Sequence, residues 1–163
     1  MRYLLILVSS GLIACGANAP KSDSMAVDTS STGDSANVQT FDINDDGAPD
    51  SWQYFRLVDG QRVLARKEFD VNFDTRVDIW RFYGAQGAIE RDQMDMDFDG
   101  KVDVTTIYED SKIVRKEVDL EFDERPDVFK FYQEGVLTRL EGDSDNDGRI
   151  DYWEYYKNGA LLR

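Results

Sequence analysis

The chain of 163 residues contains no histidine and only one cysteine, Cys15. Without histidine it lacks the most common general base of enzymes and the most common protein ligand of transition metals. A single cysteine cannot form an intramolecular disulfide, and a structural zinc site of the usual cysteine and histidine type is excluded as well.

Basic residues are also scarce, because 19 Lys and Arg face 33 Asp and Glu, which gives a formal net charge of −14. Nucleic acids and anionic lipid headgroups both attract clustered Lys and Arg, so we expect neither nucleic-acid binding nor electrostatic docking on a membrane. Excess carboxylates fit cation binding, or a surface kept soluble by mutual repulsion. Aromatic residues make up 12% of the chain, which favours a folded body over a disordered acidic tail.

The chain has no long hydrophobic run, and the apolar stretch that follows Arg2 is too short to span a bilayer as a permanent helix. A positive start, an apolar stretch and small residues before Cys15 are typical of an export signal. The sequence Leu-Ile-Ala-Cys at residues 12–15 resembles the lipobox of bacterial lipoproteins. The resemblance implies cleavage after residue 14 and lipid attachment at Cys15, whereas the alternative is an ordinary secretory signal with an incidental cysteine.

Several acyl chains on one cysteine would anchor the protein stably in a membrane. Gly16 follows Cys15, whereas aspartate there would resemble the inner-membrane retention signal of enteric bacteria, so we favour the outer membrane within the cell envelope. Small and polar residues without an apolar period indicate a flexible linker up to residue 37. The predicted organisation is a signal peptide at 1–14, the lipidated cysteine and linker at 15–37, and a repeat domain at 38–163.

Acidic clusters recur every 24 to 28 residues in this last region, beginning at Asp42, Asp70, Asp95, Asp119 and Asp143. Each cluster precedes a run rich in Val, Ile, Thr and aromatic residues, a short turn such as Asn158-Gly159, and a second apolar run. A constant period of this length indicates a repeat architecture. We predict an all-β domain of five tandem β-hairpin repeats joined by acidic, Asp-rich loops, as an extended meander, a solenoid or a closed ring.

Strand alternation places one pair of residues from each unit on the same face of the predicted sheet. These pairs are Trp52 with Tyr54, Trp80 with Phe82, Thr105 with Ile107, Phe129 with Phe131, and Trp153 with Tyr155. Stacked units would align them into an aromatic ladder. We interpret the stripe as core packing and keep a carbohydrate or ligand platform as the alternative.

The acidic loops carry oxygen-bearing side chains at positions 1, 3, 5 and 9, and three of them have glycine at position 6. Calcium takes roughly six to eight oxygen ligands, and glycine permits the sharp turn around the ion. These loops resemble EF-hand loops and the calcium loops of dockerins and thrombospondin repeats, which implies calcium as the cofactor. The full pattern occurs in Asp42, Asn44, Asp46, Gly47 and Asp50; in Asp95, Asp97, Asp99, Gly100 and Asp103; and in Asp143, Asp145, Asp147, Gly148 and Asp151.

The second loop (Asp70, Asn72, Asp74, Asp78) has Thr75 instead of glycine, and the fourth (Asp119, Glu121, Asp123, Asp127) has Glu124. We predict that both are spacers without metal, balanced by cations such as Arg81 and Lys130. The EF-hand pattern has a bidentate glutamate at position 12, which only the fifth loop retains, as Glu154. A strand would place position 12 on the face opposite position 9, which would leave the sites open. Alternatively, the acidic residues only form turns.

We expect an exported, membrane-anchored lipoprotein whose calcium-binding repeat domain has a structural or protein-binding role, with an unidentified envelope or surface protein as partner. The alternatives are a metal-free β-repeat interaction scaffold and a calcium-responsive regulator. Enzymatic activity is not expected, because every carboxylate cluster recurs with the repeat, whereas a catalytic carboxylate pair would be unique. The sequence also has no nucleophile elbow, phosphate loop or zinc motif.

Overall fold

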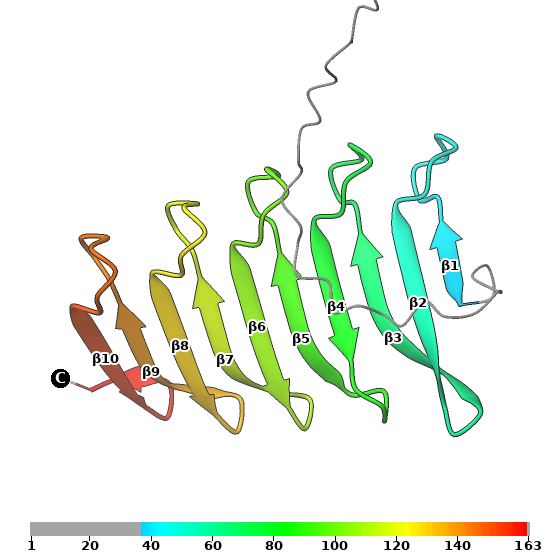
Figure 1. Cartoon of the computed structure of the whole chain (residues 1–163). Helices are drawn as coiled ribbons and strands as arrows, with labels where there is room; N and C mark the ends of the chain where they lie inside the picture. The colour runs from blue at the N-terminus through cyan, green and yellow to red at the C-terminus, as the bar shows by residue number, and fades with distance from the viewer. Residues whose placement is uncertain (1–36, 163) are drawn as a thin grey trace, which may run out of the picture. The chain divides into compact units, whose positions relative to one another are not determined.

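Eleven β-strands form one antiparallel sheet in which each strand pairs with its neighbours in the chain (Figure 1). This computed structural model describes residues 37–162, so the predicted signal peptide, Cys15 and nearly all of the predicted linker lie outside the described residues. The strands are β1 (Val38–Phe41), β2 (Ser51–Val58), β3 (Gln61–Phe69), β4 (Ile79–Tyr83), β5 (Ile89–Met94), β6 (Val104–Glu109), β7 (Lys112–Val118), β8 (Val128–Gln133), β9 (Val136–Gly142), β10 (Tyr152–Lys157) and β11 (Ala160–Leu161).

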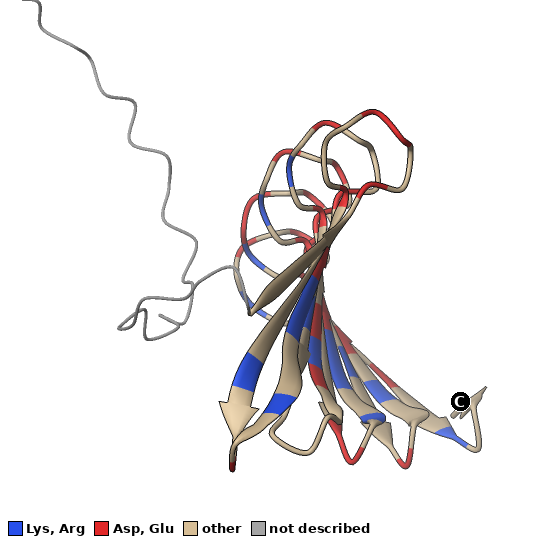
Figure 2. Cartoon of the chain, turned by 90° about the vertical axis from the view of Figure 1, so that its right-hand side faces the viewer, with Lys and Arg blue, Asp and Glu red and all other residues tan. Residues whose placement is uncertain are grey.

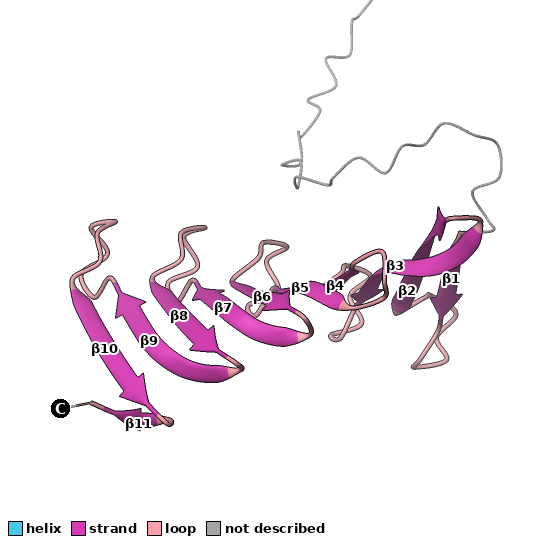
Figure 3. Cartoon of the chain, turned by 90° about the horizontal axis from the view of Figure 1, so that it is seen from below, coloured by secondary structure: helices cyan, strands magenta, loops and turns pink. Residues whose placement is uncertain are grey.

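The sheet is an open meander of hairpins, with β1 at one end and β11 at the other. The all-β prediction is confirmed, and of the three arrangements considered the meander is the one observed. Figure 3 shows the strands in a single row, without a second layer over either face in the described part of the chain. Residues 37–162 include no helix with the length and apolarity needed to cross a bilayer. A strand, β10, follows the fifth loop where a dockerin has a helix.

The hairpin turns lie where the sequence predicted them. Four hairpins turn through two residues with positive φ at both, namely Asp59-Gly60, Asp110-Ser111, Glu134-Gly135 and Asn158-Gly159. This is the type I′ geometry, whose twist matches that of the flanking strands. The hairpin of β4 and β5 turns more widely, and the N–H of Gly84 donates to the carbonyl of Ala88 at 2.8 Å. The first four hairpins also share a bulge, which increases the local twist.

The predicted aromatic pairs do lie on one face, but charged residues of the return strands separate them. Tyr54 on β2 stands opposite Arg66 on β3, and Arg66 stands opposite Phe82 on β4. The row beside it places Glu68 between Trp52 and Trp80 in the same way. The prediction that stacked units align these pairs into an aromatic ladder is therefore wrong, because it assigned no role to the return strands.

The arginines of this face lie over the aromatic rings of neighbouring strands. The guanidinium carbons are 4.3 Å from the ring centre for Arg66 over Tyr54, 4.3 Å for Arg91 over Phe82, and 4.2 Å for Arg139 over Phe131. Three of these arginines also approach a glutamate two residues later, within 3.0 Å for Arg66–Glu68, 2.9 Å for Arg115–Glu117 and 3.2 Å for Arg139–Glu141. Their Nε–H groups form no hydrogen bond, so these contacts are ion pairs without a hydrogen bond through Nε.

Val104 and Val128 are the only hydrophobic residues fully buried among residues 37–162. The paired aromatics are half-buried or, like Trp153 and Tyr155, exposed, so the interpretation of the stripe as core packing is wrong. A single-layer sheet has no opposing layer to enclose large side chains. The lowest exposures belong instead to aspartates at the ends of the acidic loops, 1% for Asp78 and 2% for Asp50.

Gly142 allows a test of side-chain packing on the sheet face opposite the aromatic pairs. Val118 pairs with Val128 across β7 and β8, whereas Gly142 pairs with Tyr152 across β9 and β10, and a β-carbon at Gly142 would collide with the Tyr152 ring. We predict that Gly142→Val destabilises the protein by about 1–3 kcal/mol in urea unfolding, because the ring must be displaced. The double variant with Tyr152→Val recreates a Val–Val pair and should recover most of the loss; equal instability of both variants would contradict this packing.

Candidate metal centre in the acidic loops

The five acidic loops lie along one edge of the sheet, each between a return strand and the outgoing strand of the next unit (Figures 1 and 2). Figure 2 shows acidic residues concentrated on these loops, whereas most basic residues lie on the strands. Each loop has nine residues, from position 1 (Asp95 in the third loop) to position 9 (Asp103). One edge of the sheet therefore collects most of the negative charge of the repeat domain.

The aspartate at position 1 organises the loop backbone. In the third loop, the N–H of Phe98 donates to Oδ1 of Asp95 at 2.7 Å, and the N–H of Gly100 donates to Oδ2 at 2.7 Å. The second, fourth and fifth loops repeat both bonds, and the first loop repeats the bond from position 6. One carboxylate thus satisfies backbone donors that no strand partner can reach.

The aspartate at position 9 closes the loop from its other end. The N–H of Met96 at position 2 donates to Oδ2 of Asp103 at 2.6 Å, and all five loops contain the equivalent bond. The backbone ladder also continues past the strand ends, since the N–H of Asp119 donates to the carbonyl of Asp103 at 2.8 Å. Each loop thus supplies carboxylate acceptors for its own backbone N–H groups, and the backbone ladder joins neighbouring loops.

The pKa values of the loop carboxyl groups differ with their surroundings. Burial raises the pKa of Asp103 above its usual value, against the opposing effect of the Met96 N–H. Desolvation acts in the same direction on Asp143, but the N–H groups of Gly148, Asn146 and others outweigh it and lower the pKa of Asp143. A hydrogen bond from the N–H of Ala48 is the main reason that the pKa of Asp46 is lowered.

The second and fourth loops adopt the same backbone shape although they lack glycine. Thr75 has φ 73° and Glu124 has φ 72°, in the left-handed region that Gly100 also occupies with φ 94°. Their N–H groups donate to the position 1 aspartates at 2.7 Å, as the N–H of Gly100 does. Replacement of glycine therefore strains these loops without changing the shape of their backbone.

Two loops bring three carboxylates close enough together to hold a metal ion. The groups are Asp95, Asp97 and Asp99 in the third loop, and Asp143, Asp145 and Asp151 in the fifth, with one oxygen of each residue within 4.8 Å of the others. Calcium–oxygen distances are about 2.3–2.6 Å, so two oxygens on one ion lie at most about 5 Å apart. The donor set consists only of hard carboxylate oxygens, which suits a hard divalent cation.

The remaining predicted ligands lie outside these two groups. Asp103 accepts the bond from Met96, and Asp147 accepts one from the N–H of Arg149 at 2.9 Å. The carboxylate of Glu154 accepts a hydrogen bond from the hydroxyl of Tyr156 and does not join the fifth-loop group. The predicted residues of the first loop form no such group in the described structure, and there the Asn44 amide donates to Asp46 at 2.9 Å.

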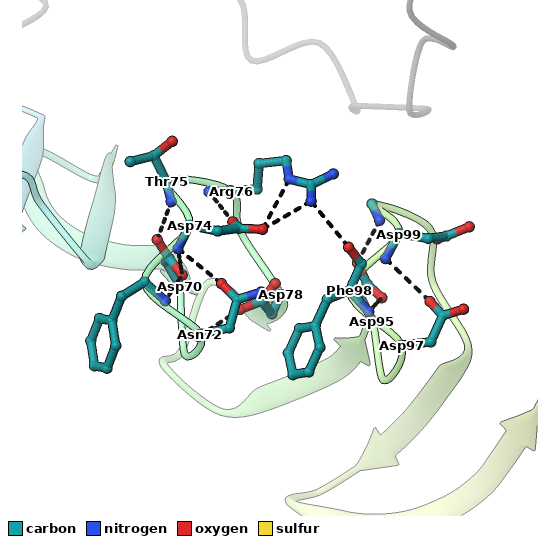
Figure 4. A network of polar contacts seen from close by, with 12 residues as sticks. Asp70, Asn72, Asp74, Thr75, Arg76, Asp78, Asp95, Asp97, Phe98 and Asp99 are labelled. Carbon is teal, nitrogen blue, oxygen red and sulfur yellow. Dashed lines mark hydrogen bonds and ion pairs between the residues drawn. The ribbon is translucent and has the colours of Figure 1, made fainter.

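Basic residues at position 7, rather than the predicted ones at position 12, pair with the loop carboxylates. Figure 4 shows Arg76, which pairs with Asp74 at 2.9 Å and also donates to the carbonyl of Phe98 in the next loop at 3.2 Å. Lys101 lies 3.4 Å from Asp99 and 3.0 Å from Glu124 in the following loop. The recurrence of Arg or Lys at position 7 in the last four loops was the signal that could have predicted these bridges.

The two residues predicted to balance the spacer loops do not contact them. Arg81 forms a bidentate pair with Asp92 on β5, at 2.7 and 2.8 Å, and the Tyr108 hydroxyl donates to the same carboxylate at 3.0 Å. Lys130 forms no ion pair within residues 37–162. Both residues lie on strands, three residues beyond the last position of the loops that precede them.

Position 4 was not identified as unusual from the sequence. Phe73, Phe98 and Phe122 occupy it in the middle three loops with φ of 63°, 65° and 61°. Asp45 and Asn146 occupy it in the end loops with φ of 62° and 61°, and these two residue types tolerate the left-handed region. Bulky residues in such conformations cost roughly 1–3 kcal/mol each.

Comparisons with known proteins add little to this geometry. No protein-family model matches the chain, and no curated protein matches it. A structure of accessory secretory proteins 1, 2 and 3 from Streptococcus pneumoniae is similar with a TM-score of 0.43 and 14% identity. The similarity covers 66% of this chain and 19% of that one, so this chain spans about a fifth of the length of the protein it matches.

The strained position 6 residues generate a reciprocal test. We predict that Thr75→Gly raises stability by about 1 kcal/mol, since left-handed backbone is unfavourable for a β-branched residue. Gly100→Thr places the same side chain at φ 94° in the third loop and should lower stability by at least as much. Chemical denaturation of both variants in the presence of a chelator measures these effects. If Thr75→Gly instead lowers stability, the threonine side chain stabilises the loop by more than its left-handed backbone costs, which would contradict the prediction.

Proposed function

We propose that this protein is an exported lipoprotein, anchored in the bacterial envelope through Cys15, whose repeat domain binds calcium in its acidic loops and has a structural or protein-binding role. The observation that supports calcium is the convergence of Asp95, Asp97 and Asp99, and of Asp143, Asp145 and Asp151, on two loops of the repeat. The lipobox resemblance around Cys15 supports the anchor.

The ligand chemistry favours calcium over other cations. Transition metals prefer imidazole or thiolate, and the chain has no histidine and only Cys15. Magnesium requires near-ideal octahedral geometry, whereas calcium accepts irregular sets of carboxylates, carbonyls and waters. Asp97, Asp99, Asp145 and Asp151 are exposed, so water can complete the coordination. Sites with three carboxylates and several waters are expected to bind weakly.

The fifth loop is the stronger of the two candidate sites in this proposal. In the third loop, the Lys101 ammonium lies 3.4 Å from Asp99 and would compete with a cation for that carboxylate. The corresponding Arg149 forms no ion pair among the described residues. The first loop, with predicted ligands Asp42, Asn44, Asp46 and Asp50, would have to break the Asn44–Asp46 hydrogen bond, so we expect it to bind most weakly.

A metal-free interaction scaffold is the second candidate, and the loop hydrogen bonds favour it. The position 1 and position 9 aspartates already satisfy loop N–H groups, so the repeat can fold with its loops empty. A calcium-responsive regulator would require the metal to change the shape of the domain. Calcium that only neutralises the exposed carboxylates would stabilise the domain without changing its shape.

We predict that calcium raises the melting temperature of the full chain carrying Cys15→Ser, and that magnesium at the same concentration does not. Binding to the folded state alone stabilises it by mass action. Asp145→Asn should remove most of the shift, Asp97→Asn a smaller part, and Glu121→Gln none. The last variant is the matched control, because it removes one exposed charge from position 3 of a loop that forms no carboxylate group.

No calcium shift, or an equal shift with magnesium, would leave the metal-free scaffold as the better account. Isothermal titration then separates weak binding from none. A change in small-angle scattering on calcium addition would instead favour the regulator, since stabilisation without a change in shape leaves the scattering curve unaltered.

Lipid attachment is tested independently of the metal. We predict that the wild-type chain, expressed in a bacterium fed an alkyne fatty acid, incorporates the label and sediments with the membranes. Cys15→Ser should abolish labelling, because the chain has no other thiol. Label-free wild-type protein released into the medium would support the ordinary secretory signal instead.

A further inference from the structure

The middle three loops expose apolar side chains next to their carboxylates. Val71, Phe73, Met96, Phe98, Leu120 and Phe122, at positions 2 and 4, are 40 to 57% exposed. Figure 4 shows the ring of Phe98 pointing away from Asp97 and Asp99. We call these six residues the apolar loop residues; they lie outside both candidate metal groups.

A comparison with the fifth loop indicates that the three phenylalanine side chains are not needed to form the loop backbone. Asn146 holds the same place in the fifth loop with φ 61°, and its N–H donates to Asp143 at 2.8 Å, as the N–H of Phe98 donates to Asp95 at 2.7 Å. A residue suited to the left-handed region therefore builds the same loop without an exposed ring. Strain and exposed apolar area together indicate a binding surface.

We propose that the apolar loop residues bind an amphipathic, basic α-helix of a partner protein, laid along the row of loops. Neighbouring loops are two strands apart, which is about 9.6 Å at the usual strand spacing. Seven residues of α-helix rise about 10.5 Å, so apolar side chains at heptad spacing match one loop after another. Recognition of a helix by such periodic apolar anchors is an established mode of peptide binding.

The charge of the loops selects the partner. The three loops at 70–78, 95–103 and 119–127 contain twelve acidic and three basic residues. A helix with Lys and Arg beside its apolar face complements this charge, whereas an anionic membrane surface is repelled by it. This inference does not depend on the proposed calcium binding, and its test is carried out in chelator.

The probe is a fluorescent peptide of Leu at heptad-spaced positions and Lys elsewhere, with a scrambled peptide of identical composition as its control. The full chain carrying Cys15→Ser should bind the periodic peptide and not the scrambled one. Phe98→Asn, which installs the residue of the fifth loop, should weaken binding about tenfold for loss of a central anchor. Leu57→Thr, which removes an exposed apolar side chain from β2, should leave the affinity unchanged.

Thermal unfolding separates a binding role of Phe98 from a packing role. The melting temperature of Phe98→Asn should stay the same or rise, because asparagine tolerates the left-handed backbone; a fall of several degrees would make Phe98 a structural residue and overturn the proposal. Equal binding of both peptides, or none, would overturn it as well. Binding to phosphatidylethanolamine and phosphatidylglycerol vesicles that Phe98→Asn abolishes, with no peptide binding, would identify a lipid surface instead.

Discussion

Each loop of this sheet depends on carboxylates that receive backbone N–H groups. A nine-residue connection between strands leaves donors that the ladder cannot reach, and an unpaired buried donor costs about 1–3 kcal/mol. The aspartates at positions 1 and 9 accept those hydrogen bonds, as Asp95 and Asp103 do in the third loop. Asp95 and Asp103 are only 2% and 4% exposed, because the loop backbone folds around them. The acidic character of the repeat thus has a structural origin before any question of metal arises.

A sheet built in this way can extend sideways without a second layer. Hydrophobic burial is small, so lateral contacts between strands must contribute more than in a sandwich. The rows in which Arg66, Arg91 and Arg139 lie over aromatic rings supply such contacts in the first, second and fourth units, each worth about 0.5–1 kcal/mol at exposed sites. The aromatic rings in these rows are only partly buried. The resulting domain has nearest-neighbour energetics, in which each hairpin depends on the two beside it.

The sequence predicts much of this fold because the relevant signals are local. Strand alternation, the turn residues and the period of the acidic clusters together predicted the hairpins, although they left open whether the hairpins form a meander, a solenoid or a ring. Features that depend on the neighbouring strand were missed. The return-strand arginines stand between aromatics only because of the register, as with Arg66 between Tyr54 and Phe82. The register of β4 and β5 also places Arg81 opposite Asp92. The two residues pair, so Arg81 does not balance the second loop as predicted.

The sequence predicts the loops that form the candidate site better than it predicts the individual ligands within them. The spacing pattern treats Asp95, Asp97, Asp99 and Asp103 alike, although their surroundings differ. Asp103 is buried and closes the loop, whereas Asp97 and Asp99 are exposed. In the second loop the neighbouring Arg76 occupies the equivalent carboxylate of Asp74. A protein cation and a metal ion are thus alternative partners for the same position 5 carboxylate. The residue at position 7 therefore acts on the position 5 carboxylate alone. It matters in the third loop, whose carboxylate group includes Asp99, and not in the fifth, whose group of Asp143, Asp145 and Asp151 omits position 5.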